Sequence, residues 1–265
     1  GEMKWIFHTI PHPGEEGYET WPKDAYLKSG GVNSWSGFSL DKERGIVYAP
    51  TGSASFDFYG GDRIGANLFA NCIIALDAKT GKRIWHYQTI HHDIWDRDLP
   101  SPPNLMTIEK DGEKIDVVAQ ITKSGYLFVL NRETGEPIYP IEERPIPQSD
   151  LDGEESWPTQ PIPTVYPAFS RTHITEEDLA IRSEEAKAFA RRTWDNNLVG
   201  QEFLPPSVKG TVMFPGFDGG GEWGGAAINP KSSTLFVNSN EISWHLDVSP
   251  NVMSTAGTNV YKINC

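Results

Sequence analysis

The sequence predicts an antiparallel all-β fold, and three observations support this prediction. Short runs of β-branched, aromatic and aliphatic residues recur along the chain, which is the pattern of strands. Gly, Asn and Asp lie between these runs, where they allow tight turns. The runs follow one another without helices between them, as in antiparallel sheets and unlike alternating strand–helix units.

Each expected strand is a run of four or five residues bounded by a turn. We expect strands at 46–49, 72–76, 117–121, 126–130 and 234–238. The turns that bound them are expected at 41–45, 79–82, 123–125, 132–135 and 229–232. Residues 137–167 are rich in proline and have no clear period, so we expect an irregular connection there.

One segment has helical character instead. Residues 175–194 are rich in helix formers and begin with Thr175 and Asp178 at capping-box spacing. Its small and apolar side chains fall on one face at helical spacing, namely Ala186, Phe189, Ala190 and Trp194. We therefore expect one helix, or two short helices, on a long loop.

A sequence repeat becomes visible when the turns are aligned. Residues 75–85 read A-x-D-x-x-T-G-x-x-x-W, residues 130–136 repeat the middle of this pattern, and residues 1–5 match its end. Recurrence at roughly 50 to 75 residues, in pieces large enough for four strands, is typical of propeller blades. We expect the Asp and the Thr-Gly pair to build a hairpin turn, and the Trp to pack against a neighbouring blade.

Composition excludes several classes of protein. The 265 residues are 38% hydrophobic and 11% aromatic, which is too apolar for a disordered chain. The formal net charge of −13 argues against nucleic acid as a partner. No apolar run reaches the ~18 residues of a membrane span, and no signal peptide opens the chain. Cys72 and Cys265 are too few for a disulfide framework or a zinc site, although one bridge between them stays open.

The eleven-residue repeat resembles the tryptophan-docking motif of the pyrroloquinoline quinone (PQQ) dehydrogenases, eight-bladed propellers that oxidise alcohols and sugars. Residues 85–100 and 134–145 are most similar to the branch that contains quinoprotein glucose dehydrogenase. The resemblance covers nearly the whole chain and is weakest over 145–210. It implies about half of an eight-bladed propeller over 1–255, with a helical insertion near 175–194. Family members are much longer, so we expect a middle portion of a periplasmic or secreted protein.

The resemblance assigns the catalytic base to Asp96. In the family, the Asp of the matching stretch takes the alcohol proton while hydride moves to the quinone, and it also contacts the bound metal. A carboxylate can do this work at neutral pH if its surroundings tune its pKa and a neighbouring cation holds it ionised. The alternative is a turn carboxylate that follows a packed Trp95.

A metal cluster is a second interpretation of the same stretch. His91, His92, Asp93, Asp96 and Asp98 are all residue types that bind metals. Adjacent histidines on an extended strand point to opposite faces, so His91 and His92 do not easily share one ion. We favour a structural role for both.

The resemblance implies a Ca²⁺ ion bound by Asp96 and by the residue at position 53. Ser53 stands where the family has an Asn ligand, and a serine hydroxyl is a shorter and weaker donor for Ca²⁺. Asp98 matches the extra Asp of lanthanide-dependent relatives, although the following Leu99 and Pro100 match the sugar-oxidising branch instead. We therefore expect Ca²⁺ more than a lanthanide.

Three segments are expected at the cofactor. Lys123 matches the family's Lys or Arg that donates hydrogen bonds to the quinone oxygens; the alternative is a solvated turn lysine. Trp35 matches the Trp that forms the floor beneath the flat cofactor; the alternative is a core Trp. Glu222 and Trp223, in a glycine-rich stretch, match a polar residue and a Trp at the cofactor edge of the family. The same stretch does not fit a phosphate-binding loop, because no GK[ST] follows the glycines.

The end of the sequence resembles the lead-in to a c-type haem site. Cys265 would be the first cysteine of C-x-x-C-H, and residues 256–265 would begin a cytochrome c domain that binds haem c in the uncut protein. The alternative is a plain strand that ends on a free or disulfide-bonded cysteine.

Together these features predict a PQQ-dependent dehydrogenase of a sugar or an alcohol, with Asp96 and Lys123 as the catalytic pair. Electrons would pass on to a cytochrome or a quinone. Two alternatives remain at this point: a non-catalytic propeller scaffold that binds proteins, and a degenerate relative in which Ser53 marks lost metal binding.

Overall fold

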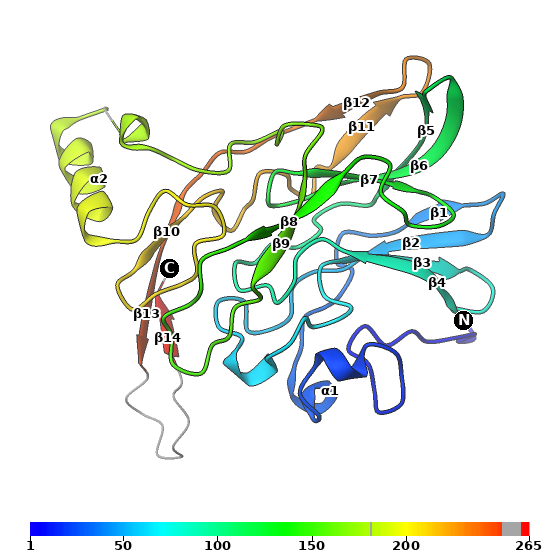
Figure 1. Ribbon diagram of the computed structural model, residues 1–265, viewed down its shortest axis with the longest axis horizontal. Helices are drawn as coiled ribbons and strands as arrows, with labels where there is room; N and C mark the ends of the chain where they lie inside the picture. Colours follow the sequence, from blue (N-terminus) through cyan, green and yellow to red (C-terminus); the bar gives the residue numbers. More distant parts are fainter. Residues whose placement is uncertain (181, 251–260, 265) are drawn as a thin grey trace.

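The computed structural model describes residues 1–180, 182–250 and 261–264, and these fold mainly into antiparallel strands (Figure 1). These residues contain two α-helices, α1 (Ala25–Lys28) and α2 (Glu184–Asn196), and three short 3₁₀ turns, η1 (Tyr18–Thr20), η2 (Gly61–Arg63) and η3 (Glu176–Asp178). The strands are β1 (Ser39–Asp41), β2 (Ile46–Pro50), β3 (Cys72–Asp77), β4 (Arg83–Gln88), β5 (Asn104–Lys110), β6 (Glu113–Ile121), β7 (Leu127–Asn131), β8 (Ile141–Pro145), β9 (Thr159–Pro163), β10 (Thr211–Met213), β11 (Ala226–Asn229), β12 (Thr234–Val237), β13 (Trp244–Pro250) and β14 (Tyr261–Asn264).

The strands form separate small sheets rather than one large sheet. Their orders are β1-β2-β3-β4, β5-β6-β7, β8-β9, β11-β12 and β10-β13-β14, and every pair is antiparallel. Sequence-adjacent strands pair as simple meanders in the first two sheets, which is the construction of propeller blades. The all-β prediction is confirmed, and the five expected strands correspond to β2, β3, β6, β7 and β12. Their bounds agree within one residue except at the start of β6, which begins four residues earlier than expected.

The docking role of the repeated tryptophans is confirmed. The Trp85 ring, on β4 of the first sheet, packs against Gly135 in the turn after β7 of the second sheet. Its Nε1 donates to the Arg132 carbonyl at 3.1 Å. The Trp5 ring packs against Gly81 in the turn between β3 and β4 in the same way, and the equivalent hydrogen bond to the Ala78 carbonyl is also 3.1 Å.

The acidic or amide residue of each repeat builds its turn, as expected. Asp77 Oδ1 accepts hydrogen bonds from the Lys79 and Thr80 backbone amides at 3.1 and 2.7 Å. In the next repeat, Asn131 Oδ1 takes the same place and accepts from the amides of Glu133 and Thr134 at 2.9 and 3.1 Å.

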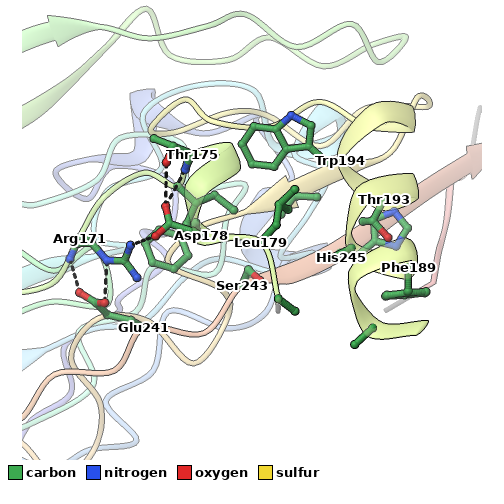
Figure 2. Close-up of a pocket in the computed structure, with 16 residues that line it drawn as sticks. Arg171, Thr175, Asp178, Leu179, Phe189, Thr193, Trp194, Glu241, Ser243 and His245 are labelled. Atoms are coloured by element: carbon green, nitrogen blue, oxygen red, sulfur yellow. Dashed lines mark hydrogen bonds and ion pairs between the residues drawn. The ribbon is translucent and has the colours of Figure 1, made fainter. Parts of the chain in front are cut away.

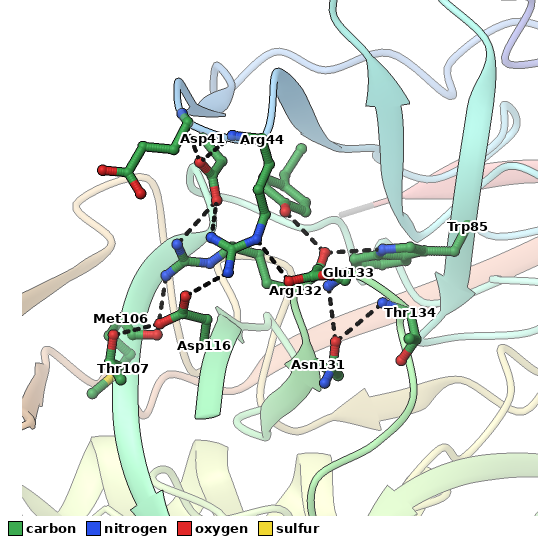
Figure 3. A network of polar contacts seen from close by, with 12 residues as sticks. Asp41, Arg44, Trp85, Met106, Thr107, Asp116, Asn131, Arg132, Glu133 and Thr134 are labelled. Atoms are coloured by element: carbon green, nitrogen blue, oxygen red, sulfur yellow. Dashed lines mark hydrogen bonds and ion pairs between the residues drawn. The ribbon is translucent and has the colours of Figure 1, made fainter. Parts of the chain in front are cut away.

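A polar network joins the first two sheets beside the docked Trp85 (Figure 3). Asp41, at the end of β1, has a buried side chain and accepts from Arg44 at 3.0 Å and from Arg132 at 3.1 Å. Arg44 also contacts Asp116 of β6 at 2.7 Å. These ion pairs and the docked ring therefore tie the same two blades together.

The prediction of an irregular connection over the proline-rich segment 137–167 is wrong. The segment contains β8 and β9, which pair in the register Ile141↔Pro163 to Pro145↔Thr159. A two-stranded sheet has only edge strands, and edge strands tolerate proline because not every backbone N–H takes part in the ladder.

The helical insertion is confirmed as a short 3₁₀ turn, η3, followed by α2, at one edge of the molecule (Figure 1). The Thr175–Asp178 capping box is present: the Thr175 amide donates to Asp178 Oδ2 at 2.8 Å. Within the described ranges, no helix combines the length and the apolar character required to cross a bilayer.

Within the described residues, Cys72 is a free thiol buried in β3. Cys265 and most of the segment 256–265 lie outside the described residues, while 261–264 form β14 beside β13. The haem ligand and the cytochrome c boundary at residue 256 therefore stay predictions.

Candidate functional site

Two aspartates, a lysine and a serine from three loops meet at one face of the first two sheets. Ser53 follows β2, and Asp96 and Asp98 lie between β4 and β5. Because β2 and β4 are both antiparallel to β3, their ends fall at the same edge of the sheet. Lys123 lies in the turn between β6 and β7 and reaches the same place.

The Lys123 ammonium group joins the two carboxylates. Its Nζ lies 3.1 Å from Asp96 Oδ2 and 3.0 Å from Asp98 Oδ2. The lysine side chain is 7% exposed, against 22% for Asp96 and 14% for Asp98. A cation so well buried between two carboxylates is not the solvated turn lysine of the alternative interpretation.

The two carboxylates differ in their hydrogen bonding. Asp98 Oδ1 accepts from the Ser53 backbone amide at 2.6 Å and from the Ser53 hydroxyl at 3.0 Å. Asp96 Oδ1 lies 3.4 Å from the same hydroxyl, which has one proton and is closer to Asp98. Protein donors therefore engage both oxygens of Asp98, whereas Asp96 keeps one oxygen almost free.

This difference separates the pKa values of the pair. Burial and the neighbouring Asp98 charge raise the pKa of Asp96 to about 8, and Lys123 offsets only part of this effect. Burial also acts to raise the pKa of Asp98, but Lys123 and the Ser53 hydrogen bonds outweigh it and lower that pKa. Two adjacent carboxylates with opposite pKa shifts are typical of sites where one of them handles a proton.

The loop that carries both aspartates is held by internal hydrogen bonds. Asp93 accepts from the amides of Trp95 at 2.8 Å and Arg97 at 2.6 Å. Asn71 donates to the Asp93 carboxylate at 2.8 Å and to the Arg97 carbonyl at 2.9 Å. This bracing holds Asp96 in a left-handed backbone conformation, with φ of 57°.

The histidines have structural roles, but not for the reason given from the sequence. They lie in an irregular loop rather than on a strand, and His92 has a positive φ. His92 is fully buried between the Gly65 carbonyl at 2.8 Å and Glu154 at 2.7 Å. His91 contacts Gln88 at 2.7 Å. In the described part of the chain, no group of three or more His, Cys, Asp or Glu side chains could hold a metal ion.

The residues predicted to bind metal nevertheless lie together. Asp96, Asp98 and Ser53 present only oxygen donors, which suits a hard cation such as Ca²⁺ in chemistry. These three side chains offer fewer oxygen atoms than the six to eight that Ca²⁺ binds, so this chain would supply part of such a site. The raised pKa of Asp96 also fits, because burial and the neighbouring Asp98 charge oppose its ionisation and the Lys123 ammonium group offsets only part of this effect.

The cofactor-facing residues lie around the same cluster. Trp35 is 44% exposed, so it is not a core Trp, and Lys123 Nζ lies 6.0 Å from the centre of its ring. An exposed flat ring beside a buried cation offers a platform on which a planar anion could stack. Gly52 lies between Trp35 and Asp98, and a Cβ at this position would overlap Asp98 Oδ1.

The glycine-rich stretch contacts the site through its backbone. The amide of Gly220 donates to the Lys123 carbonyl at 2.6 Å, and a Cβ on Gly219 would lie 2.5 Å from Lys123 Cβ. Glu222 and Trp223 follow, but no contact joins them to the Lys123 cluster among the described residues. Trp223 is 76% exposed, and Glu222 accepts from the Trp223 amide at 2.8 Å.

Arg97, which lies between the two site aspartates in the sequence, is a site residue that no sequence motif predicted. Its guanidinium is buried and donates to the carbonyl of Gly216 at 2.8 Å and to that of Pro215. It therefore ties the aspartate loop to the segment that leads into the glycine-rich stretch. Nothing in the local pattern signals this contact, because its partners lie 118 and 119 residues away.

Comparison with known proteins gives one family over most of the chain. Residues 1–262 match the family model "PQQ: Glucose/ethanol/alcohol dehydrogenase, beta-propeller domain". The chain is 36% identical over 245 residues to the quinoprotein glucose dehydrogenase of Gluconobacter oxydans, which covers 90% of this chain and 29% of the relative. It is 39% identical over 220 residues to the glycerol dehydrogenase large subunit of Gluconobacter thailandicus, which covers 81% of this chain and 30% of the relative.

Solved structures give the same fold. The quinohemoprotein alcohol dehydrogenase of Pseudomonas putida superposes with a TM-score of 0.62 at 25% identity, over 94% of this chain and 33% of that protein. The chain thus spans about 30% of the length of the curated relatives it matches.

Proposed function

The chain belongs to the PQQ glucose/ethanol/alcohol dehydrogenase β-propeller family, and on this premise we propose that it carries the catalytic loops of a PQQ-dependent sugar or alcohol dehydrogenase. One observation carries the proposal. Lys123 bridges Asp96 and Asp98 beside the exposed Trp35 ring, and only Asp96 keeps a carboxylate oxygen free of strong protein donors.

In the proposed reaction, Asp96 receives the proton of the substrate hydroxyl. A base must be ionised to act, and the pKa of about 8 shows that burial and Asp98 oppose ionisation. A further cation against the free Asp96 oxygen would lower this pKa and hold the carboxylate ionised at neutral pH. PQQ would supply the two-electron acceptor and Ca²⁺ the Lewis acid when they are bound.

Lys123 and Asp98 position the reacting groups. Lys123 would present its ammonium group to an electronegative oxygen of the cofactor, since Nζ lies close to the Trp35 face on which the ring would stack. Asp98 would hold Lys123 in place, because its second oxygen is fixed by Ser53. Metal ligation is assigned to Asp96, Asp98 and Ser53, and the cofactor edge to Glu222 and Trp223.

The remaining parts of the proposal concern the whole protein. The substrate would be a small sugar, polyol or alcohol, as the names of the matched glucose, glycerol and alcohol dehydrogenases suggest. The electrons would pass to a cytochrome or a quinone, and the protein would act in the periplasm or outside the cell. Haem c would enter only through Cys265 in a longer chain.

One observation favours the degenerate-relative alternative. Lys123 already lies between the two carboxylates, where a metal ion would otherwise balance their charge, and Ser53 replaces the stronger Asn donor. In that case the protein would bind PQQ weakly or not at all, with no dependence on Ca²⁺.

The full-length protein, reconstituted with PQQ and Ca²⁺, tests both possibilities by dye reduction across sugars, polyols and alcohols. Absence of both PQQ binding and turnover would reject the enzyme proposal. Asp96→Asn should abolish turnover while PQQ remains bound, as measured by equilibrium dialysis. Asp111→Asn, in the exposed β5–β6 turn, is the matched control and should keep full activity. An active Asp96→Asn enzyme would refute the role of Asp96 as base.

A further inference from the structure

A cavity of about 450 Å³ lies beneath helix α2, away from the Asp96 site. We propose that it binds a small, uncharged aromatic compound that carries a hydroxyl or carbonyl oxygen. The volume falls in the range of small-molecule sites, about 300–1,000 Å³. Neither Asp96, Lys123 nor Trp35 lines it, so this site is distinct from the one described above.

The wall on the helix side is the apolar face predicted from the sequence. All four of its members line the cavity: Ala186, Phe189, Ala190 and Trp194. None of the 13 residues of α2 is buried, and Phe189 is 63% exposed. A helix of this length is marginal by itself and normally gains stability by burying such a face. The lining residues outside the helix include the apolar Val212 and Phe214, so they add apolar surface that an occupant could cover.

The charged residues at the rim are paired with one another, one guanidinium with two carboxylates, which leaves one net negative charge. Arg171 Nε lies 2.8 Å from Glu241, and the same guanidinium contacts Asp178 (Figure 2). This group lies at one end of the cavity, with Phe189 at the other. His245 is engaged as well, at 2.9 Å from Asn197 and 3.2 Å from Asp247.

These pairings select against a charged ligand. An anionic ligand group would meet a net negative rim, and a cationic group would have to compete with Arg171 for the two carboxylates. Burying an ion that is not fully paired is costly. A neutral ring avoids this cost and gains the burial of its apolar surface.

The cavity also offers hydrogen bonds that the protein does not use. Thr193 of α2 and Ser243 both line it, and neither hydroxyl has a hydrogen-bond partner within the part of the chain that the structure describes. Either hydroxyl can donate to or accept from a ligand oxygen. A hydroxyl or carbonyl group on the ring therefore fits better than a pure hydrocarbon.

Binding to the full-length protein tests this proposal directly, with a pair of probes that share one ring system. We expect 2-naphthol to bind with a Kd of about 100 μM or tighter by equilibrium dialysis, which corresponds to a modest free energy for each of its ring atoms. Naphthalene-2-sulfonate has the same ring with a permanent charge and should bind at least about tenfold more weakly. Equal or tighter binding of the sulfonate would overturn the assignment of a neutral ligand.

Two tryptophan substitutions on α2 locate the site. Ala190→Trp places a large ring in the cavity and should abolish 2-naphthol binding. Ala188→Trp makes the same change at an exposed position that does not line this cavity, so it should bind like the wild type. Phe189→Ser serves as a second variant, because this mostly exposed side chain can be removed without opening the core; it should weaken binding at least about fivefold.

The proposal is overturned if the wild-type protein does not bind 2-naphthol. This would be the result if another segment of the full-length protein filled the cavity. The proposal is also overturned if both Ala190→Trp and Phe189→Ser bind like the Ala188→Trp control. PQQ binding and dye reduction are measured separately, so failure here leaves the proposed dehydrogenase function untouched.

Discussion

Replacing Gly135 by Ala would test whether docking of Trp85 stabilises neighbouring blades. A Cβ on Gly135 would lie 2.6 Å from two Trp85 ring atoms, Cδ2 and Cε3, whereas carbon atoms in contact normally lie about 3.5–4.0 Å apart. The ring is only 5% exposed, and its Nε1 is hydrogen-bonded to Arg132, so it cannot simply swing aside. Trp85 would have to move by roughly 1 Å, and overpacking of this kind costs about 1–3 kcal/mol.

The backbone adds a second cost at the same position. Gly135 has a φ of 75°, in the left-handed region, where a residue with a Cβ is disfavoured by about 1–2 kcal/mol. We therefore expect Gly135→Ala to lower the free energy of unfolding by about 2–5 kcal/mol. Gly45→Ala is the matched control, because Gly45 has a φ of 67° and an added Cβ would meet no atom within 4 Å.

Urea denaturation of the full-length protein, followed by circular dichroism and tryptophan fluorescence, measures both variants. The difference in unfolding free energy between Gly135→Ala and Gly45→Ala measures the effect of the Trp85 docking contact, and it should be at least about 1 kcal/mol. Gly81→Ala should behave like Gly135→Ala, since its Cβ would overlap the Trp5 ring. If Gly135→Ala and Gly45→Ala lose the same stability, the docked ring contributes nothing and the reasoning from the repeat fails.

Three further predictions follow from the buried polar groups. Burial acts to raise the pKa of Asp41, but hydrogen bonds from Arg44 and Arg132 outweigh it and keep this pKa below its ordinary value. Asp41→Asn should therefore lower the free energy of unfolding by about 2–3 kcal/mol at pH 7. The difference in unfolding free energy between variant and wild type should shrink as the pH falls through the lowered pKa of Asp41, and an equal difference in urea titrations at pH 7 and pH 3 would contradict this. Burial raises the pKa of the Cys72 thiol, so Cys72 should stay unlabelled by iodoacetamide until denaturant is added, as read by peptide mapping, and rapid labelling of Cys72 in the folded protein would count against its burial. Lys123→Met should weaken PQQ binding at least about tenfold in equilibrium dialysis, with partial recovery in Lys123→Arg, and unchanged affinity would remove Lys123 from the cofactor site.

Much of the fold could be predicted because its signals are local. A strand such as β3 is a run of apolar residues between turn residues, and the Asp77 and Asn131 turns are made by side chains that hydrogen-bond to amides two and three positions along. Residues 141–145 and 159–163 escaped prediction because their prolines suppress the usual strand pattern. Their pairing depends on each other rather than on any local preference.

The candidate site, like the fold, has features that local motifs predict and features that depend on distant segments. Motifs predict site roles separately for Asp96, Lys123 and Trp35. Each residue also has an alternative interpretation as an ordinary structural or surface residue, which the motif by itself does not exclude. Burial of Lys123 between two carboxylates and exposure of the Trp35 ring argue against a solvated lysine and a core Trp, because both depend on which loops meet in space. The role of Asp96 as base stays a prediction.

The sequence by itself determined strands β2, β3, β6, β7 and β12, the repeated turns, the docking tryptophans and the residue types available for chemistry, since these follow from side-chain spacing within a few residues. Only the tertiary structure decided which aspartate has a free oxygen, because Ser53 reaches Asp98 from 45 residues away. It also decided that the apolar face of α2 lines a cavity instead of entering the core. Both outcomes arise from packing between distant segments, where a small difference in position determines which polar atoms meet and which apolar surfaces stay uncovered.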